Sequence, residues 1–247
     1  ANILTAIEPR WFHLDRRVEK ISGYHRNLVR KLSDIDIAIA TSVNTVAPTK
    51  KLFASIPKAY YIQDYETWIC DEDVVQQSYR DGLINIVISN YLKDIVEKYA
   101  GKQPILIKNP VDINFYKVIK PIESRKKHSV SLLYHTKEHK GVKYALEALN
   151  ALREKYPDLN VEMFGIFPAP VTLPSWIHYT KGATPEQVLE IYNATAVYLC
   201  ATVEEGYGLT GLEAMSCGTA LVSTGYRGVY EYARSGENAL LSPVKDV

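Results

Sequence analysis

Apolar and polar positions follow two rhythms that alternate along the chain. Short runs of Val, Ile, Leu and Tyr, typical of buried strands, are separated by longer stretches in which apolar residues recur every three or four positions, as on one face of a helix. The clearest helical stretch is "NYLKDIVEKYA", residues 90–100, where Leu92, Ile95 and Val96 share a face. Strands that alternate with helices in this way predict parallel sheets covered by helices, the α/β class.

The same pattern divides the chain into two series of elements. In the first we expect strands over residues 34–41, 58–63, 84–89 and 104–108. In the second we expect strands over 129–135, 160–166, 176–180, 196–202, 219–224 and 238–243, with helices over 141–155, 184–194, 209–217 and 229–234. The basic, proline-containing stretch between them has the composition of a linker. We therefore predict two doubly wound parallel-sheet domains, an N-terminal one over 1–115 and a C-terminal one over 129–247, joined by a linker over 116–128.

Composition and charge narrow the classes of function. The 29 basic and 28 acidic side chains nearly cancel, so the chain lacks the positive field of a nucleic-acid-binding protein. Cys70, Cys200 and Cys217 have no metal-ligand spacing, which is typical of reduced thiols in the cytosol. No apolar run reaches the roughly 18 residues that a membrane-spanning helix needs. We expect a cytoplasmic protein with no nucleic-acid partner.

One stretch, "EEGYGLTGLEAMSCGTALVST", carries the candidate chemistry, and it directly follows a predicted strand. Gly206 and Gly208 allow the backbone to approach a ligand closely. A helix that begins near Leu209 leaves its first N–H groups unpaired, and these donors together with the helix dipole favour a phosphate group. Glu205 and Glu213 are placed to accept hydrogen bonds from sugar and ribose hydroxyls. The alternative interpretation is that both glutamates are solvated and the glycines only tighten a turn.

Residues 204–243, "EEGYGLTGLEAMSCGTALVSTGYRGVYEYARSGENALLSP", resemble the donor-site signature of the family 4 retaining glycosyltransferases, which have the GT-B fold of two Rossmann-like domains facing a cleft. The signature is an E-x7-E pair around a G-(F/Y)-G-L loop, then E-A-M-x-C-G, a glycine turn and a further glutamate. Glu205 and Glu213 match the pair, and Glu231 matches the last position. "NPVDINFY" and "LLYHTKEHKGVKYALEAL" resemble the interdomain and first strand-helix units of the family more weakly.

This resemblance implies transfer of a sugar from a nucleotide-diphosphate sugar to a glycan or lipid-linked acceptor. It implies retention of configuration, no metal and no cofactor. Lys140 would neutralise the leaving diphosphate, Glu205 would position the transferred sugar and Glu213 would bind the ribose. Further donor contacts would come from the loop and the helix start, at Gly206, Tyr207, Gly208, Leu209 and Thr210.

The sequence departs from the family where arginine is usual and Tyr134 and His135 stand instead. We expect His135 or Lys137 to take over the phosphate contact, although neither offers the bidentate fork of a guanidinium group. His135 and His139 also have the spacing of a zinc-binding pair, but no third ligand is visible. Partial burial at a strand end is the simpler interpretation of these histidines.

On the N-terminal side, "AYYIQDYETW" occupies the place where the family often has a histidine followed by an aspartate. Asp64 is a candidate for orienting the acceptor hydroxyl, and it is an equally good candidate for capping the loop. The Q-D-Y-E form is similar to the branch that builds rhamnose-containing and other bacterial surface polysaccharides. The basic run "SRKKH", residues 124–128, is a weak candidate for peripheral contact with the inner face of a membrane, and a solvated linker is the alternative.

Two features of the sequence leave the prediction open. We find no glycine-rich turn before Asp34, and the chain stops at "SPVKDV", where the family continues with further helices. We therefore expect the N-terminal domain to be incomplete and the C-terminal domain to lack its terminal helices. A GT-B-like protein that binds nucleotide sugars without turnover, and a sugar-nucleotide epimerase, are the alternative functions.

Overall fold

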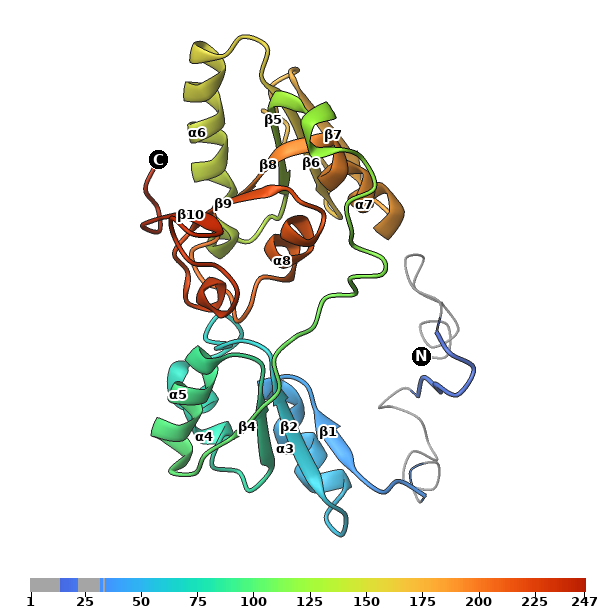
Figure 1. The fold of residues 1–247 in the computed structure, drawn as a ribbon. Coiled ribbons are helices and arrows are strands. Elements are labelled where there is room, and N and C mark those ends of the chain that lie inside the picture. Colours follow the sequence, from blue (N-terminus) through green and yellow to red (C-terminus); the bar gives the residue numbers. More distant parts are fainter. Residues whose placement is uncertain (1–13, 22–31, 33) are drawn as a thin grey trace.

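The computed structural model describes residues 14–21, 32 and 34–247 and contains two parallel-sheet domains, one above the other in the view of Figure 1. The N-terminal sheet has the strand order β1-β2-β3-β4 and the C-terminal sheet the order β10-β9-β8-β5-β6-β7. Every pairing between these strands is parallel, as predicted for the α/β class. Most of the stretch before Asp34, where we found no glycine-rich turn, lies outside the described residues.

The N-terminal domain is built from four short strands and three helices. The strands are β1 (Ala38–Ala40), β2 (Lys58–Ile62), β3 (Ile84–Val87) and β4 (Ile105–Leu106), and the helices are α3 (Val43–Leu52), α4 (Glu72–Ser78) and α5 (Asn90–Ala100). One face of the sheet is buried under the helices, because alternate residues such as Tyr60 and Val87 pack against Leu92 and Val96 of α5. The expected strands and helix 90–100 are confirmed, whereas α3 and α4 were not predicted.

The C-terminal domain contains the larger sheet. Its strands are β5 (Lys126–Leu133), β6 (Asn160–Gly165), β7 (Ile177–Lys181), β8 (Thr195–Cys200), β9 (Ala220–Thr224) and β10 (Ala239–Ser242). Its helices are α6 (Val142–Lys155), α7 (Pro185–Ala194) and α8 (Leu209–Ser216), with 3-10 turns η1 (Ile122–Ser124), η2 (Glu138–Lys140) and η3 (Arg227–Glu231). The predicted helix over 229–234 is wrong in type and position, because this glycine-containing segment forms the shorter 3-10 turn η3.

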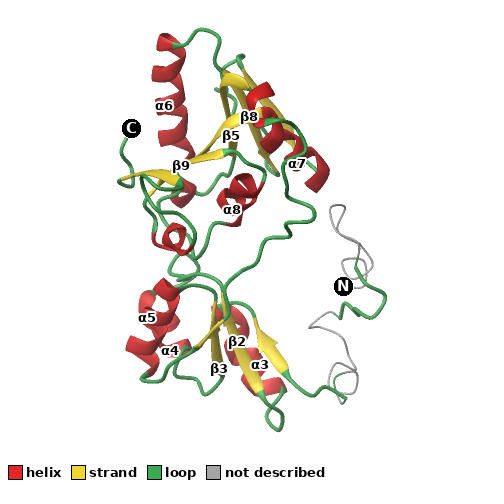
Figure 2. Ribbon diagram, viewed as in Figure 1, coloured by secondary structure: helices red, strands yellow, loops and turns green. Residues whose placement is uncertain are grey.

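Helices cover both faces of the C-terminal sheet (Figure 2). On one face, Ala145 and Leu149 of α6 pack with Leu132 and Met163 of the central strands. On the other face, the α7 and α8 side chains pack in a separate cluster around Tyr198. Successive side chains of a strand point to opposite faces of the sheet. The near-continuous apolar runs of these strands therefore contribute side chains to the apolar cores on both faces.

An extended connection crosses from β4 to β5 and is fastened to the C-terminal domain (Figure 1). The Asn193 side-chain oxygen accepts hydrogen bonds from the backbone N–H groups of Ile119 and Lys120 at 2.8 and 3.3 Å. The buried guanidinium group of Arg125 donates to the carbonyl oxygens of Cys217 at 2.6 Å and Thr195 at 3.2 Å. β5 begins at Lys126, so the last residues of the predicted linker are part of the C-terminal sheet.

The order of the C-terminal strands reverses at β5. From β5 the chain proceeds to β6 and β7 on one side, and β8, β9 and β10 follow on the other side. In open α/β sheets, ligands bind in the crevice at the carboxyl ends of the strands where this reversal occurs. The candidate site should therefore lie after β5 and β8. Within the part of the chain that the structure describes, no helix has the length and apolar character needed to cross a membrane.

Candidate functional site

The loops that leave β5 and β8 are joined to each other at the reversal point. The backbone N–H of Val203 donates a hydrogen bond to the carbonyl of His139 at 2.7 Å. This bond places η2, which ends at Lys140, beside the loop that contains Glu205. Lys140 Nζ lies 3.0 Å from Glu205 Oε1, and only 19% and 27% of the two side chains are exposed. A lysine and a glutamate that are 65 positions apart thus form a largely buried ion pair at the place predicted for the donor.

A narrow crevice of about 20 Å³ adjoins this ion pair. Lys140, Thr202, Glu205 and Thr210 are among its lining residues, together with mostly apolar residues of β5, β8 and α6. Thr210 belongs to the first turn of α8, where helix N–H groups have no intrahelical partner. The crevice therefore brings together a cation, a carboxylate and a helix N-terminus.

Two glycines shape the loop between β8 and α8. Gly208 precedes α8 with φ of 90°, a left-handed conformation that favours glycine. Gly206 lies against the N-terminal domain so closely that a Cβ atom there would be 2.0 Å from the carbonyl oxygen of Gln63. A side chain at position 206 would push the two domains apart. The Gly-Tyr-Gly sequence is thus a requirement of the domain contact as well as of the turn.

Asp64 approaches the same ion pair from the other domain. Its carboxylate accepts hydrogen bonds from the Tyr65 backbone N–H at 2.8 Å and from the Trp68 indole N–H at 3.3 Å. Burial raises the pKa of Asp64; the negative charge of Glu205 adds to this rise and the positive charge of Lys140 opposes it. The N-terminal domain therefore supplies a carboxyl group that interacts electrostatically with both members of the Lys140–Glu205 pair.

Glu213 lies in the middle of α8, where tyrosines from two other segments face it. The Tyr192 hydroxyl donates to Glu213 Oε2 at 3.3 Å. Burial raises the pKa of Glu213 to about 7, and hydrogen bonds from Tyr192 and Tyr116 limit the rise. Around neutral pH this carboxyl group is thus present in both protonation states, and its charged form is a strong hydrogen-bond acceptor held in a dry environment.

His135 and Lys137 follow β5, close to Lys140. His135 Nδ1 accepts a hydrogen bond from the Lys137 backbone N–H at 3.0 Å. Burial and the positive charge of Lys140 lower the pKa of His135, which favours its neutral form at pH 7. Lys137 Nζ lies 3.2 Å from the centre of the Trp68 ring, a cation–π contact between the two domains.

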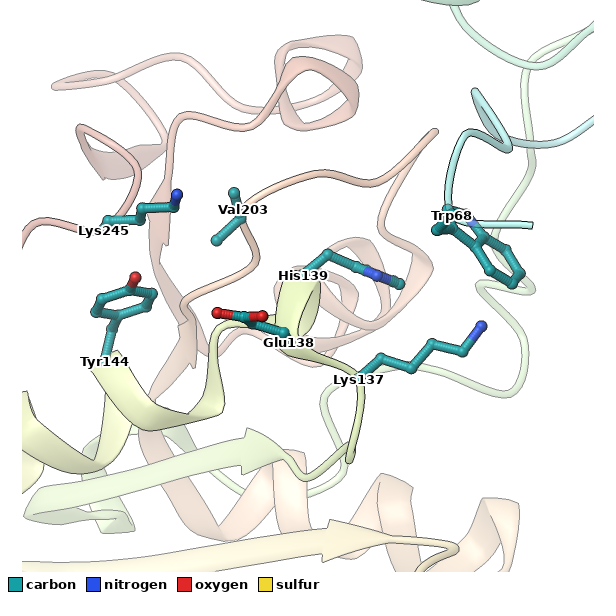
Figure 3. A pocket seen from close by; sticks show the side chains of 7 residues that line it. All are labelled: Trp68, Lys137, Glu138, His139, Tyr144, Val203 and Lys245. Atoms are coloured by element: carbon teal, nitrogen blue, oxygen red, sulfur yellow. The ribbon is translucent and has the colours of Figure 1, made fainter. Parts of the chain in front are cut away.

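A larger cavity of about 590 Å³ opens behind η2 (Figure 3). Its lining residues come from both domains and are Trp68, Lys137, Glu138, His139, Tyr144, Val203 and Lys245. Figure 3 shows that the side chains of Lys137 and His139 point toward Trp68, which forms the wall from the N-terminal domain. The Trp68 indole that lines this cavity is the same group that donates a hydrogen bond to Asp64.

The remaining predicted donor residues take different positions. Tyr207 is 6% exposed, and its side chain packs in the apolar core of the N-terminal domain. Only the Tyr207 backbone is thus available at the loop. Leu209 is 40% exposed at the start of α8. Among the described residues, no group of three or more His, Cys, Asp or Glu side chains is arranged to hold a metal ion.

Sequence reasoning missed the role of Trp68 and the full extent of the contact between the domains. The Trp68 indole bonds to Asp64 four positions earlier, a spacing that alone indicates nothing about a partner domain. Tyr91 and Glu204 form a second contact, in which the tyrosine hydroxyl donates to the carboxylate at 3.0 Å across the domain boundary. The cation–π contact of Trp68 with Lys137 and the Tyr91–Glu204 bond each join segments that lie at least 60 residues apart, so no local pattern could have indicated them.

Residues 129–247 match the family described as glycosyl transferases group 1. A phosphatidyl-myo-inositol mannosyltransferase from Propionibacterium freudenreichii subsp. shermanii is 24% identical over 147 residues, which make up 58% of this chain and 38% of that protein. The chain thus spans well under half of the length of this relative.

Two solved structures share the arrangement of both domains. HepE of Anabaena in complex with UDP-glucose superposes with a TM-score of 0.74 at 16% identity, over 89% of this chain and 68% of that chain. A sucrose-phosphate synthase from Thermosynechococcus elongatus gives a TM-score of 0.73 at 14% identity, over 89% of this chain and 64% of that chain. The chain therefore has the GT-B fold, and its C-terminal domain carries the match to the glycosyl transferases group 1 family.

Proposed function

We propose that the protein is a retaining glycosyltransferase, which moves a sugar from a nucleotide-diphosphate sugar to a glycan or lipid-linked acceptor. The observation that carries this proposal is the Lys140–Glu205 pair at the reversal point, with Asp64 of the other domain beside it. Such an arrangement places a cation for the donor phosphates next to carboxylates for sugar hydroxyls. The site works in the cytoplasm or at the inner face of a membrane, where a lipid-linked acceptor is within reach.

The positive charge at this site suits the bond that must break. When the bond between C1 of the sugar and the phosphate oxygen breaks, negative charge grows on the phosphate. Lys140 and the N-terminus of α8 stabilise that charge more in the transition state than in the bound donor. The His135 imidazole, which is mostly neutral, would contribute a hydrogen bond instead of a second charge. Because these groups supply the positive charge, the proposed reaction needs no metal ion.

The carboxylates serve positioning in this mechanism, and none is a covalent nucleophile. The acceptor hydroxyl attacks C1 from the face that the phosphate leaves, so the new C1–O bond has the old configuration. Its proton passes to the leaving phosphate, which balances the charge. Asp64 orients the acceptor hydroxyl from the N-terminal domain, and Glu205 holds the hydroxyls of the transferred sugar. Glu213 accepts hydrogen bonds from the ribose in place of the one from Tyr192.

Binding of a donor must rearrange the site. The crevice of about 20 Å³ has room for roughly one water molecule, so a phosphate group, which is larger, can enter only when Lys140 and Glu205 separate. The phosphate then replaces Glu205 as the counter-ion of Lys140, and Glu205 is released to bind the sugar. Exchange of one anion for another keeps the buried lysine paired throughout.

Assay of the intact protein with UDP-, GDP- and dTDP-sugars tests this function. UDP-glucose is the first donor to try, because the similar HepE was solved in complex with it. We expect transfer to persist in EDTA and the product to keep the anomeric configuration of the donor, as read by NMR. An inverted product would contradict the proposed mechanism. Absence of transfer with every donor, despite tight nucleotide binding, would show that the protein binds nucleotide sugars without turnover.

Substitution of Lys140 tests whether sugar transfer takes place at this site. Lys140→Ala should lower kcat by about 10²- to 10³-fold, the usual cost of removing one group that stabilises transition-state charge. Lys143→Ala is the matched control, because Lys143 also forms an ion pair, with Glu138 at 3.2 Å, but on the exposed surface. We expect the control to retain kcat within twofold. If both substitutions lowered kcat equally, Lys140 would have no specific catalytic role.

One observation favours the second candidate, a nucleotide-sugar-binding protein without turnover. Tyr134 and His135 stand where the similar enzymes usually have arginine, so the donor phosphate lacks the bidentate contact with a guanidinium group. Substitution of His135 by Arg separates the two functions. An enzyme that already works through Lys140 should change its rate little, whereas a protein that lost turnover at this position should gain transfer.

The kind of polysaccharide that the protein helps to build is part of the same proposal. The Q-D-Y-E sequence after β2 supports synthesis of a bacterial surface polysaccharide that contains rhamnose. Inclusion of dTDP-rhamnose in the donor panel tests this. Its failure as a donor, with another sugar transferred, would contradict the branch and leave the reaction class unchanged.

A further inference from the structure

Glu231 is a buried carboxylate whose partners all belong to the other domain. It lies at the end of η3 in the C-terminal domain, and 4% of its side chain is exposed. Its Oε1 accepts a hydrogen bond from the Asn90 backbone N–H at 2.6 Å, and its Oε2 accepts one from Asn90 Nδ2 at 3.1 Å. Lys108 Nζ lies 2.8 Å from the same Oε2, and this bond raises the pKa of Lys108. Glu231 thus closes a three-bond contact across the domain boundary.

This contact depends on the relative position of the domains. A carboxylate without water is unfavourable unless it is paired and hydrogen-bonded. For Glu231 the compensation comes from Lys108 and from the first turn of α5, whose N–H groups have no partner within the helix. The α5 dipole also favours negative charge at this end. If the domains move apart, all three bonds break together, so Glu231 favours this one arrangement.

η3 is in turn packed against the loop that carries Glu205. A Cβ atom at Gly228 would lie 2.5 Å from the Glu205 carbonyl oxygen, so the two backbones are in direct contact. Just beyond η3, the Tyr232 hydroxyl donates to the Gly208 carbonyl at 2.8 Å. Any displacement of η3 is therefore passed to the loop over residues 205–208 through backbone contact and a hydrogen bond.

We propose that Glu231 is a positioning residue, which fixes the loop 205–208 against the N-terminal domain so that Glu205 faces Asp64. The inference rests on the proposed function and extends it to a group that touches neither donor nor acceptor. The contact joins α5, η3 and the loop into one unit, and its loss lets the two carboxylates separate while the donor site within the C-terminal domain stays intact. Glu231 stands at the last glutamate of the signature that residues 204–243 resemble.

The test compares Glu231→Ala and Glu231→Gln with Glu237→Gln in the intact protein. Glu237 is the matched control, because it lies six residues further along the same segment with 71% of its side chain exposed, and its pairing with Arg234 is long, at 3.8 Å. Three quantities are measured for each variant: the dissociation constant of UDP by calorimetry, kcat and KM for transfer, and hydrogen exchange of the Asn90 backbone amide by NMR.

If the proposal holds, Glu231→Ala lowers kcat at least tenfold, keeps the UDP dissociation constant within twofold and accelerates exchange at Asn90 at least tenfold. Glu231→Gln, which keeps an acceptor for the Asn90 N–H but no charge for Lys108, falls between Glu231→Ala and the wild type. A wild-type kcat in Glu231→Ala overturns the proposal. Loss of UDP binding in parallel with kcat also overturns it, because Glu231 would then only stabilise the C-terminal domain.

The measurements separate this proposal from the proposed function. If the wild type transfers no sugar, the function fails, and exchange at Asn90 still decides whether the contact exists. Unchanged exchange in Glu231→Ala then overturns the positioning role. Should Glu231→Ala fail to fold, Glu231→Gln carries the same comparison with a smaller expected effect.

Discussion

Glu213→Gln should make the protein more stable at high pH and leave its stability nearly unchanged at low pH. In the folded protein, burial raises the pKa of Glu213 from its ordinary value of 4.5 to about 7. Between these two values the folded protein keeps a proton that the unfolded chain has released. The free energy of unfolding therefore falls as the pH rises through this window, and the fall is complete above pH 7.

The size of this effect follows from the same two pKa values. One pKa unit corresponds to about 1.4 kcal/mol, so the rise to about 7 amounts to roughly 3 kcal/mol, reduced to about 2–3 kcal/mol by solvent that reaches part of the side chain. Glutamine has nearly the same shape, stays neutral and can still accept the hydrogen bond from Tyr192. For a domain of this size, 1 kcal/mol shifts Tm by about 2–4 °C, so the variant should gain about 4–12 °C at pH 8.

Thermal unfolding of both proteins at pH 5, 6, 7 and 8 measures this difference. The Tm of Glu213→Gln minus that of the wild type should be near zero at pH 5 and should grow to its full value by pH 8. Glu190→Gln is the matched control, since it removes a carboxylate that lies on the exposed side of α7. A difference for Glu213→Gln that is constant from pH 5 to 8 would refute the argument that this carboxyl group is buried and protonated at low pH.

Three further outcomes are expected. The UDP affinity of the wild type divided by that of Glu213→Gln, both measured by calorimetry, should rise by up to about tenfold from pH 6 to pH 8, because the ribose binds the ionised carboxylate. A ratio that does not change with pH would exclude ribose binding at this residue. Gly206→Ala should abolish transfer and keep UDP affinity within a few-fold, since its Cβ would lie 2.0 Å from the Gln63 carbonyl oxygen; full activity would contradict the domain contact. Arg125→Met should lower the free energy of unfolding by about 3 kcal/mol or more in a denaturant titration, because it leaves several buried carbonyl groups unpaired; a loss under about 1 kcal/mol would mean that water reaches them.

The elements that hydrophobic pattern and turn residues define were predictable from the sequence. The helix over residues 90–100 has a clear apolar face, ends at Gly101 in the left-handed conformation and was found as expected. α7 begins with a capping box between Thr184 and Gln187, a purely local signal. α3 was missed because Pro48 lies inside it and its apolar positions form no strong stripe. Its stability comes from packing on β1 and β2, which no local pattern reports.

The candidate site was predictable only in part, for a different reason. The E-x7-E stretch and Lys140 indicated the donor side by resemblance, and the structure places Lys140 and Glu205 together. It also shows that the hydroxyl of Tyr192 bonds to Glu213, a contact between α7 and α8 that the spacing of eight positions between Glu205 and Glu213 does not reveal. The contacts of Trp68 and Glu231 join distant segments, and their geometry depends on how two separately folded sheets meet. Such contacts are properties of the assembled pair of domains.

The burial of Tyr207 in the neighbouring domain has a consequence for protein engineering. The obvious place to join the halves of two GT-B proteins into a hybrid is the connection between the sheets, if each half is regarded as an independent module. Here one aromatic ring of the C-terminal half completes the apolar interior of the N-terminal half. A hybrid with a foreign N-terminal half must therefore also inherit a cavity of matching shape for this ring, or the ring is left in water and the cavity empty. Tyr207 thus belongs to the C-terminal half by sequence and to the N-terminal half by packing. A junction in the exposed connection between the sheets would separate this ring from its core.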